Sequence, residues 1–404
     1  MKPTRAGAQF IFITMFLDAL GIGILIPVFP DVIRRFGTDA SFVSHMFGYF
    51  IAAYALMQFL ASPILGALSD RYGRRPVLLL SLFCAGLDYL VMAFAPNLWI
   101  LFLGRIVSGL TGASMTVASS YMADISDDSN RSANFGLIGA AFGLGFIVGP
   151  ALGGLLGGWG PTAPFLLAAV MNLLNFAFGL VVLPESLPPE SRRNVDVKRL
   201  NPFKSVIKIL SPSPIMMLVW VYLFVYLAGH VHSSIWTLYT QAKFGWSTFE
   251  VGLSLSVVGI LSAISQGYLT RLLIPKWGEV KVLEFGLVVY VLSFFLYAIA
   301  TQGWMIYPIM LGTFIAGVGG PALQSLISKD VPSREQGELQ GSLISIASLT
   351  AIIAPLLYTD LFARFSGPNA IWDFPGMPYL LASLICAVSF GLFMAAPLRR
   401  GDPR

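Results

Sequence analysis

The chain has 404 residues, of which 56% are hydrophobic and only 11% are charged. Because about a quarter of the residues of a soluble domain are charged, this composition excludes a soluble globular protein and predicts an integral membrane protein. The net charge of +5 does not indicate a nucleic-acid partner, because the basic residues lie in short loops rather than on an amphipathic face with interleaved aromatic side chains.

Apolar runs of about 20 residues recur along the chain, and each is long enough to cross the hydrocarbon layer of a bilayer as an α-helix. A transmembrane barrel would show shorter, alternating segments, so the sequence predicts an all-α polytopic membrane protein. The first run follows Lys2 and Arg5 but is too long for the apolar region of a signal peptide, and we expect it to be retained. Twelve spans are expected, at about residues 8–29, 42–66, 76–95, 97–121, 133–159, 162–183, 214–240, 249–274, 281–301, 304–327, 337–362 and 376–397.

A long, proline-rich polar loop with several basic residues divides the spans into two groups of six, as is typical of a cytoplasmic linker. We therefore predict an N-terminal six-helix bundle (1–183), a cytoplasmic linker (184–213) and a C-terminal six-helix bundle (214–404). The two halves repeat at an offset of about 206 residues, since Gly149-Pro150 in span 5 is matched by Ala354-Pro355 in span 11.

The basic residues are distributed unevenly between the two sides of the membrane. All of them lie in the termini or in the loops of one side, except for Arg34, Arg35, Lys243 and Arg364 on the other side and Arg105 within a span. Because basic residues mark the cytoplasmic side, both termini are predicted to be cytoplasmic, in a multi-pass protein of a bacterial-type inner membrane.

The loop between spans 2 and 3 reads G-A-L-S-D-R-Y-G-R-R. Gly66 would let a helix end approach a neighbour closely, and Gly73 can take the left-handed backbone conformation. Asp70 can bond the N–H groups of a helix N-terminus or pair with an arginine. From charge alone, the loop is a solvated turn that sets the topology through its three arginines, Arg71, Arg74 and Arg75.

Span 5 contains a regular series of glycines. Small residues at every fourth position form a smooth stripe on which another helix can lie, and a proline inside the span invites a bend. Such stripes are common in membrane bundles, so helix packing alone explains the stripe. The residues of this motif are Gly136, Gly145, Gly149, Pro150, Gly153 and Gly154.

Ionisable residues inside spans carry the most information about function, because a charge in hydrocarbon is costly and normally faces a cavity or a partner. Asp18 lies near the middle of span 1 without an obvious partner, so we expect desolvation to favour its protonated form. Asp88 in span 3 and Arg105 in span 4 lie at similar depth and could meet. They form either a static structural pair or a functional one, and Asp18 is the predicted proton site.

Span 7 presents Tyr222, Tyr226 and His230 on one helical face. This stripe is either packing or a wall of the substrate cavity, and His230 could also relay protons near neutral pH. Further polar residues within spans are expected either to line the cavity or to bond between helices. These are Gln58, Ser108, Asn172, Asn175, Ser262, Gln266 and Gln324.

No enzymatic site is expected. Cys84 and Cys386 both lie in apolar runs, which excludes a disulfide framework and a Cys/His metal site. The sequence contains no nucleophile-base pair, metal cluster or cofactor motif.

Two spacings resemble known signatures. Gly66-x3-Asp70-Arg71-x-Gly73-Arg74-Arg75 resembles the loop signature of the major facilitator superfamily, and the span 5 motif resembles the antiporter signature of its drug exporters. Most of the chain resembles, more narrowly, the 12-helix tetracycline/proton antiporters. The shared motifs are Leu17-Asp18-Ala19, Pro27-Val28-Phe29-Pro30, Leu87-Asp88-Tyr89, Gly104-Arg105, Lys276-Trp277-Gly278-Glu279 and Pro321-Ala-Leu-Gln324.

The resemblance implies a fold of two six-helix repeats with the substrate between them, and no cofactor besides the proton gradient. It implies the electroneutral exchange of a metal-chelated tetracycline cation for a proton. Asp18, Asp88 and Arg105 match the functional positions within the membrane, and Asp70 and Arg74 match those of a gating loop. The small-molecule substrate, protons and the lipid bilayer are the expected partners.

The chain departs from this family at two positions, with Tyr290 where the family has an acid in span 9 and Ser262 where it has a histidine in span 8. The alternative is therefore a proton-coupled exporter of another small metabolite or a multidrug exporter. A non-transporting receptor or sensor is a remote alternative, because it would be expected to carry an added soluble signalling domain.

Overall fold

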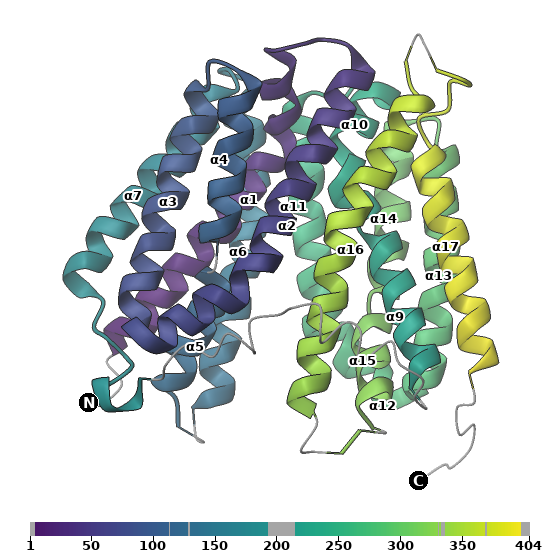
Figure 1. The fold of residues 1–404 in the computed structure, drawn as a ribbon. Helices are drawn as coiled ribbons and strands as arrows, with labels where there is room; N and C mark the ends of the chain where they lie inside the picture. Colours follow the sequence, from purple (N-terminus) through teal and green to yellow (C-terminus); the bar gives the residue numbers. More distant parts are fainter. Residues whose placement is uncertain are drawn as a thin grey trace. The chain divides into compact units, whose positions relative to one another are not determined.

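The computed structural model describes residues 5–112, 114–127, 130–192, 215–329, 331–332, 336–367 and 370–396, and it contains no strand within those ranges. Within each of the two compact units the helices run alongside one another (Figure 1). Their bounds are α1 (Arg5–Arg34), α2 (Ala40–Tyr72), α3 (Arg74–Phe94), α4 (Leu98–Thr111), α5 (Ser114–Asp124), α6 (Arg131–Gly157), α7 (Thr162–Val182), α9 (Met216–Gly229), α10 (Val231–Phe244), α11 (Thr248–Ile264), α12 (Thr270–Trp277), α13 (Glu279–Ile299), α14 (Ile306–Ala316), α15 (Gly319–Lys329), α16 (Gln336–Arg364) and α17 (Met377–Ala395). Short 3-10 helices cover Pro189–Ser191 and Gly303–Met305, and a π-helical turn, η3, covers Ser265–Leu269.

The prediction of twelve spans is confirmed. The described residues contain twelve helical segments that are long and apolar enough to cross a membrane, and each coincides with a predicted span. Three spans are each built from two successive helices: α4 with α5, α9 with α10, and α14 with α15. A fourth, α11 with α12, contains the π-helical turn.

The chain divides into two compact units. The first unit comprises Met1–Pro202 with Trp236–Ile260, and the second comprises Phe203–Ile235 with Leu261–Arg404. Most of α10 and α11 thus belongs to the first unit by its contacts. Residues 193–213 of the predicted linker lie outside the described residues, and the predicted domain bounds stay a prediction.

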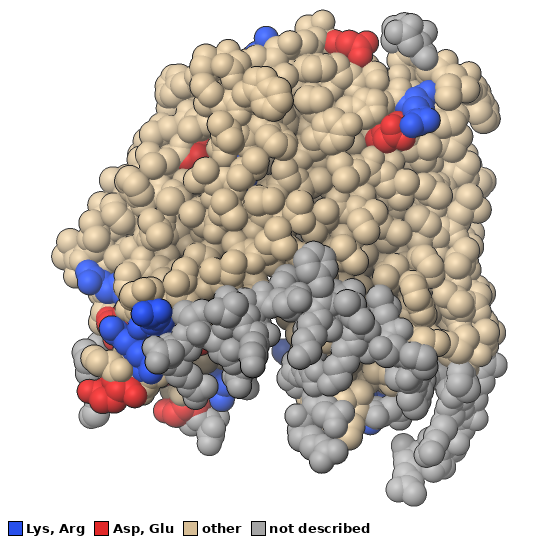
Figure 2. All heavy atoms as spheres, viewed as in Figure 1, with Lys and Arg blue, Asp and Glu red and all other residues tan. Residues whose placement is uncertain are grey.

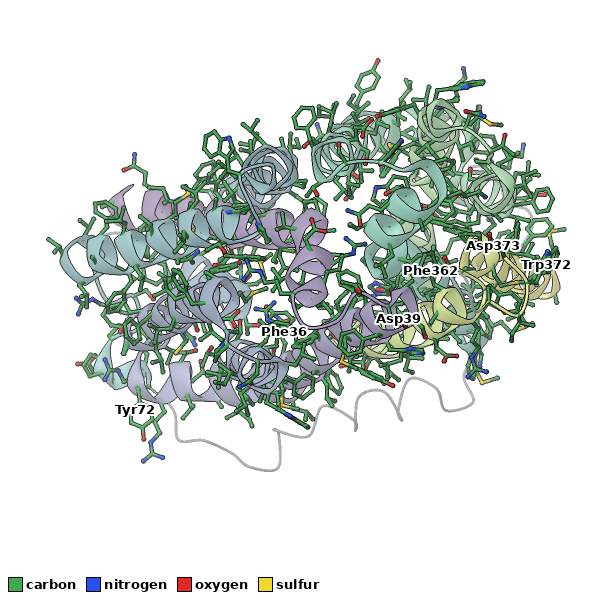
Figure 3. The ribbon with its side chains drawn as sticks, turned by 90° about the horizontal axis from the view of Figure 1, so that it is seen from above. Phe36, Asp39, Tyr72, Phe362, Trp372 and Asp373 are labelled. Carbon is green, nitrogen blue, oxygen red and sulfur yellow. The ribbon has the colours of Figure 1, made fainter. Side chains whose placement is uncertain are left out.

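Local sequence signals fix several helix ends. Asp39 begins α2 and accepts a hydrogen bond from the N–H of Phe42 at 2.9 Å, and Asn97 begins α4 and accepts one from Ile100 at 3.0 Å. Both side chains satisfy N–H groups that a helix start leaves without intrahelical partners. Asp39 lies next to the end of α1 near Phe36 when the molecule is seen from above (Figure 3).

Each unit has its own apolar core. In the first unit, buried side chains of α1, α2, α3, α5 and α6 surround Phe10, Leu78 and Tyr121. In the second, α9, α13, α15 and α16 surround Val219, Leu283 and others. Many large apolar side chains are exposed, and Figure 2 shows a broad band with very few charged atoms across the middle of the helices. This is the surface expected of helices in contact with lipid.

Candidate functional site

A buried ion pair joins α3 and α4. Arg105 donates a hydrogen bond through Nη2 to Asp88, of which only 2% of the side chain is exposed, so the predicted meeting of these residues is confirmed. The same nitrogen donates to the hydroxyl of Ser108 at 3.1 Å. The other carboxylate oxygen of Asp88, Oδ1, is buried and has no hydrogen-bond partner among the described residues. A buried acceptor left unsatisfied is costly, so the ion pair leaves part of the hydrogen-bonding capacity of Asp88 unused.

Residues of α2 cover this pair. The guanidinium carbon of Arg105 lies 4.9 Å from the centre of the Tyr54 ring, within the range of a cation–π interaction. Gln58 donates from Nε2 to the Tyr54 hydroxyl at 3.4 Å and to the Gly112 carbonyl at 2.9 Å. Helix α4 ends at Gly112, so Gln58 satisfies a carbonyl at the break within span 4. The predicted role of Gln58 in substrate binding stays a prediction.

Asp18 of α1 is half-buried and belongs to the same region. Its carboxylate forms a hydrogen bond with Ser114 at the start of α5. The Tyr54 hydroxyl lies within electrostatic range of Asp18 as well as of Asp88 and Arg105. The structure therefore brings the three predicted charged residues of the N-terminal half into one polar site. Within this site Asp18 is half-buried, whereas the Asp88–Arg105 ion pair is buried.

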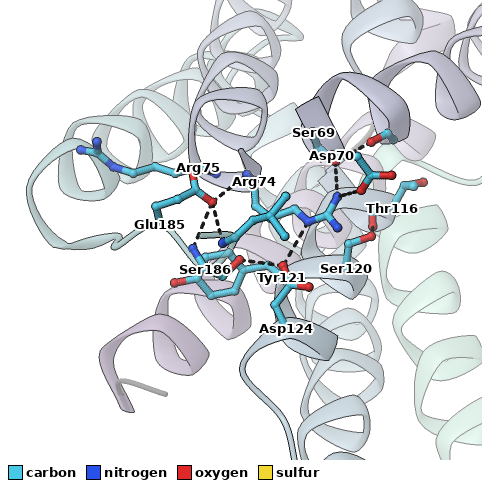
Figure 4. Close-up of polar contacts among 12 residues, drawn as sticks. Ser69, Asp70, Arg74, Arg75, Thr116, Ser120, Tyr121, Asp124, Glu185 and Ser186 are labelled. Atoms are coloured by element: carbon cyan, nitrogen blue, oxygen red, sulfur yellow. Dashed lines mark hydrogen bonds and ion pairs between the residues drawn. The ribbon is translucent and has the colours of Figure 1, made fainter. Parts of the chain in front are cut away.

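A second charged cluster lies where α2, α3 and α5 end or begin (Figure 4). Arg74, the first residue of α3, is 9% exposed at its side chain. It donates through Nη1 to Asp70 at 2.5 Å and to the Ser69 hydroxyl at 2.7 Å, and through Nε to Asp124 at 3.1 Å. Arg74 thus connects the gating loop to the end of α5. The predicted pairing of Asp70 with an arginine is confirmed.

Glu185 completes this cluster and was not predicted from the sequence. Its carboxylate accepts hydrogen bonds from the backbone N–H groups of Arg74 at 2.8 Å and Arg75 at 3.2 Å, so it caps the N-terminus of α3 (Figure 4). The neighbouring Ser186 hydroxyl donates to Asp124 at 2.9 Å. The sequence feature that could have indicated this role is an acid directly after span 6, because negative side chains stabilise helix N-termini.

The gating loop itself is shorter than predicted. Helix α2 continues to Tyr72 and α3 begins one residue after Gly73, so the turn is Gly73 alone, with φ of 105° as its predicted left-handed conformation requires. The predicted close approach at Gly66 is wrong, because the nearest atom to a Cβ there is a Thr116 methyl at 3.8 Å, an ordinary contact. Arg71 is exposed and its guanidinium lies 5.3 Å from the Tyr72 ring centre.

The glycine stripe of span 5 lies against α1. A Cβ atom on Gly145 would lie 2.8 Å from the Cβ of Ala19, one on Gly149 would lie 2.5 Å from the Leu20 carbonyl oxygen, and one on Gly153 would meet the next turn of α1. These distances are shorter than contacts of real Cβ atoms. The predicted close packing of another helix on the stripe is confirmed, and that helix carries Asp18.

The remaining residues of the motif have different surroundings. Gly154 faces α11, where a Cβ would lie 2.8 Å from the Thr248 carbonyl oxygen, and Pro150 lies within α6, which continues as one helix through it. Gly136 has no neighbour within 4 Å of a Cβ position, so packing does not require glycine there. The antiporter role of this motif stays a prediction.

The predicted aromatic stripe of span 7 is partly a packing feature. Tyr222 is 3% exposed, its ring lies 4.3 Å from that of Tyr226, and its hydroxyl hydrogen-bonds Tyr226 and Gln324. His230 directly follows α9 as its C-cap. Its backbone N–H donates to the Tyr226 carbonyl at 3.1 Å, and its backbone carbonyl accepts from the Ser234 hydroxyl at 2.7 Å. Its predicted roles in substrate binding and proton transfer stay predictions.

The remaining predicted substrate residues separate into two groups. Asn172 is buried in α7 and donates to the Ala168 carbonyl of its own helix at 2.9 Å. Ser262 and Gln266, by contrast, line one cavity of the second unit together with Tyr290. No group of three His, Cys, Asp or Glu side chains that could hold a metal occurs within the described ranges. The expected absence of a cofactor stays a prediction.

Comparison with known proteins places this arrangement in a family. The family model of the Major Facilitator Superfamily matches residues 11–355. The tetracycline resistance protein of class C from Escherichia coli is 45% identical over 388 residues, which cover 96% of this chain and 95% of that protein. The class G protein from Vibrio anguillarum is 40% identical, covering 93% and 96%.

Solved structures agree on the fold. A bacterial homolog of the human lysosomal transporter Spinster matches with a TM-score of 0.80 at 14% identity, over 100% of both chains. The human organic anion transporter MFSD10 (TETRAN) matches with a TM-score of 0.70 at 22% identity, over 97% of this chain and 100% of that one. The chain is a transporter rather than an enzyme, and it belongs to the major facilitator superfamily, in the family of the tetracycline resistance proteins.

Proposed function

We propose that this protein exports a tetracycline-type drug in exchange for protons across a bacterial inner membrane, with both termini in the cytoplasm. Two lines support the proposal: identity of up to 45% with tetracycline resistance proteins over nearly the whole chain, and the polar site in the first unit. The charge distribution of the loops supports the orientation.

The observation that carries the mechanism is the unequal environment of the two aspartates. Asp88 is buried and already neutralised by Arg105, whereas Asp18 is half-buried and, among the described residues, has a hydroxyl, that of Ser114, as its hydrogen-bonding partner. An unpaired carboxylate in a closing cavity is costly, so Asp18 must be neutralised before the carrier changes its conformation. A proton or a cationic substrate can do this, and the two compete for one carboxylate.

Exchange follows from this single constraint. Export of a bound cation and return of the protonated carrier each move a neutral Asp18, whereas the empty, ionised carrier does not reorient. The cargo can be a drug cation that carries a divalent metal, in which case the metal is part of the substrate. The fixed charges of Asp88 and Arg105 influence the affinity for either occupant through their shared field.

The experiment is uptake into inverted vesicles energised by a proton gradient, across a small panel that includes tetracycline. Tetracycline should accumulate in wild-type vesicles, stop accumulating with a protonophore, and fail to accumulate with Asp18→Asn. The departures at Tyr290 and Ser262 favour a second candidate, an exporter of another small metabolite or of several drugs. Accumulation of another member of the panel without tetracycline would support that candidate instead.

A further inference from the structure

The second unit contains a cavity with both polar and apolar lining residues that the mechanism above does not use. It has a volume of about 240 Å³ and is lined entirely by residues of that unit, from α9, α10, α11, η3, α13 and α14. Its apolar wall includes Phe294 and Phe314. Its polar lining consists of His232, Ser262, Ser265, Gln266, Tyr290 and Thr313.

Three helices lose their regular α-helical geometry at this cavity. Helix α9 ends at Gly229, the π-helical turn begins at Ser265, and α14 ends just before Gly317, and all three residues line the cavity. Irregular backbone at membrane depth is tolerated where it lines a polar or water-filled space, and π-helical turns are frequent at functional sites. In transporters, interrupted helices mark binding sites.

The break at Gly317 differs from the corresponding break in the first unit. There, the carbonyl of Gly112 accepts a hydrogen bond from Gln58 at 2.9 Å. Beside Gly317, the Ser265 hydroxyl is buried, with the residue 2% exposed, and has no hydrogen-bond partner among the described residues. A buried hydroxyl without a partner is costly, so this group can form a hydrogen bond with an occupant of the cavity.

Gly317 leaves the space in which such an occupant would lie. A Cβ atom at Gly317 would be 3.0 Å from the Ser265 hydroxyl oxygen and 3.7 Å from the Tyr290 hydroxyl oxygen. Both hydroxyls therefore converge on the position that a side chain at Gly317 would fill. The backbone of Gly317 is helical, with φ of −55°, so glycine is not needed for conformation.

The chemistry of the lining selects a neutral occupant. None of the described lining residues is Asp, Glu, Lys or Arg. The imidazole of His232 lies among the rings of Phe294, Tyr297 and Tyr379, with its Nδ1 3.2 Å from the Tyr379 hydroxyl oxygen. The cavity is smaller than the roughly 300–1,000 Å³ of sites that hold a whole drug-sized molecule, so it suits one part of such a molecule.

We propose that this cavity is a binding subsite for an uncharged part of the exported molecule that carries hydroxyl or carboxamide groups, with Ser265 and Tyr290 as hydrogen-bonding residues. The inference rests on the proposed export function, and it names the part of the cargo that the second unit holds.

The test uses purified full-length protein, with tetracycline binding measured by isothermal titration and stability measured by thermal unfolding. Ser265→Ala should weaken tetracycline binding about 2- to 12-fold, the size of one hydrogen bond. The same change should leave the empty protein as stable as wild type or more stable, because it removes a hydroxyl without a partner. Gly317→Ala should weaken binding by partly filling the subsite. Its matched control is Gly320→Ala, where a Cβ would have no neighbour within 4 Å, and that variant should bind as wild type does.

Two results would overturn the subsite. One is Ser265→Ala and Gly317→Ala binding tetracycline as tightly as wild type. The other is a lower unfolding temperature for empty Ser265→Ala, which would give Ser265 a structural role. A different result would contradict the proposed export function: wild type would bind tetracycline without accumulating it under a proton gradient. If wild type binds no tetracycline at all, both proposals fail.

Discussion

Glu279, the first residue of α13, forms an ion pair with Lys329, the last residue of α15. The first unit has the corresponding pair with the charges exchanged, between Arg74 at the start of α3 and Asp124 at the end of α5. A glycine with positive φ precedes each helix, Gly73 before α3 and Gly278 before α13. The same sequence offset separates Arg74 from Glu279 and Asp124 from Lys329. The internal duplication has thus kept the ion pair while reversing its polarity.

The Glu279–Lys329 ion pair can be tested by exchanging its charges. Glu279→Lys places two positive charges together and should slow transport several-fold, and Lys329→Glu added to it restores an ion pair and should recover most of the rate. Because the Lys329 side chain is 61% exposed, the pair contributes at most about 1 kcal/mol to stability, so unfolding should change little. Transport rates in vesicles and thermal unfolding check this. A double variant as slow as the single one would contradict it.

Asp70→Asn should slow transport without weakening substrate binding. We expect Asp70 to act as a latch, since a charge cluster at helix ends, such as its ion pair with Arg74, can break and re-form during transport. Its side chain is 46% exposed, so loss of its bond to Arg74 should cost little stability. The control is Asp373→Asn, which removes one exposed charge from the loop before α17 (Figure 3). Wild-type turnover in Asp70→Asn would exclude the latch.

Gly145→Leu should separate α6 from α1 and abolish transport, because a Cβ at this position already meets Ala19 and the α1 backbone. The matched control on the same helix is Gly143→Leu, since a Cβ at Gly143 has no neighbour within 4 Å. Membrane insertion, unfolding temperature and uptake should be measured for both. Normal insertion and wild-type uptake in Gly145→Leu would show that this packing is dispensable.

The Asp88–Arg105 pair has two interpretations that mutation separates. Asp88→Leu leaves a buried, unpaired guanidinium and should destabilise the protein by about 3–5 kcal/mol, and adding Arg105→Met should recover most of that loss. Stability is measured by denaturant unfolding in detergent. If the pair takes part in transport, the stable double variant remains inactive. If the pair is only structural, the double variant transports at the wild-type rate.

Much of the fold was predictable because apolar length dominates the sequence. All twelve spans, the positive φ at Gly73 and the approach of Asp88 to Arg105 follow from residue type and helical rise. The sequence did not show where α2 ends, because Asp70 and Arg71 look like loop residues although helix α2 includes both. In the structure Asp70 accepts a hydrogen bond from the Arg74 side chain, and Arg71 lies on an exposed face of the helix.

Partners distant in the chain were the least predictable part of the site. Glu185 contacts the start of α3, more than a hundred residues away in the sequence. An acid after span 6 is suited to cap a helix, but the sequence around it does not indicate which helix start it meets. The cavity beside Ser265 depends on a π-helical turn and on breaks in two other helices. Ser262 and Gln266 could be proposed as polar residues within a span, but their common cavity appears only when the helices are assembled.

The central claim is that one carboxylate, Asp18, binds either the proton or the cationic cargo. Asp18→Asn imitates the permanently neutral form, so it should abolish accumulation driven by a proton gradient while still allowing binding or downhill exchange. Loss of accumulation with retained binding distinguishes a coupling residue from a residue needed only for folding, because a misfolded variant would lose binding as well.

The most direct measurement is the release of protons when substrate is added to purified protein in weakly buffered solution. Wild type should release protons as tetracycline binds, because the cation displaces the proton held by Asp18. Asp18→Asn should bind tetracycline with no such release, and Asp373→Asn, in the loop before α17, should behave as wild type. Undiminished proton release from Asp18→Asn would contradict the account and would move the coupling site to another residue, with His230 as the next to test.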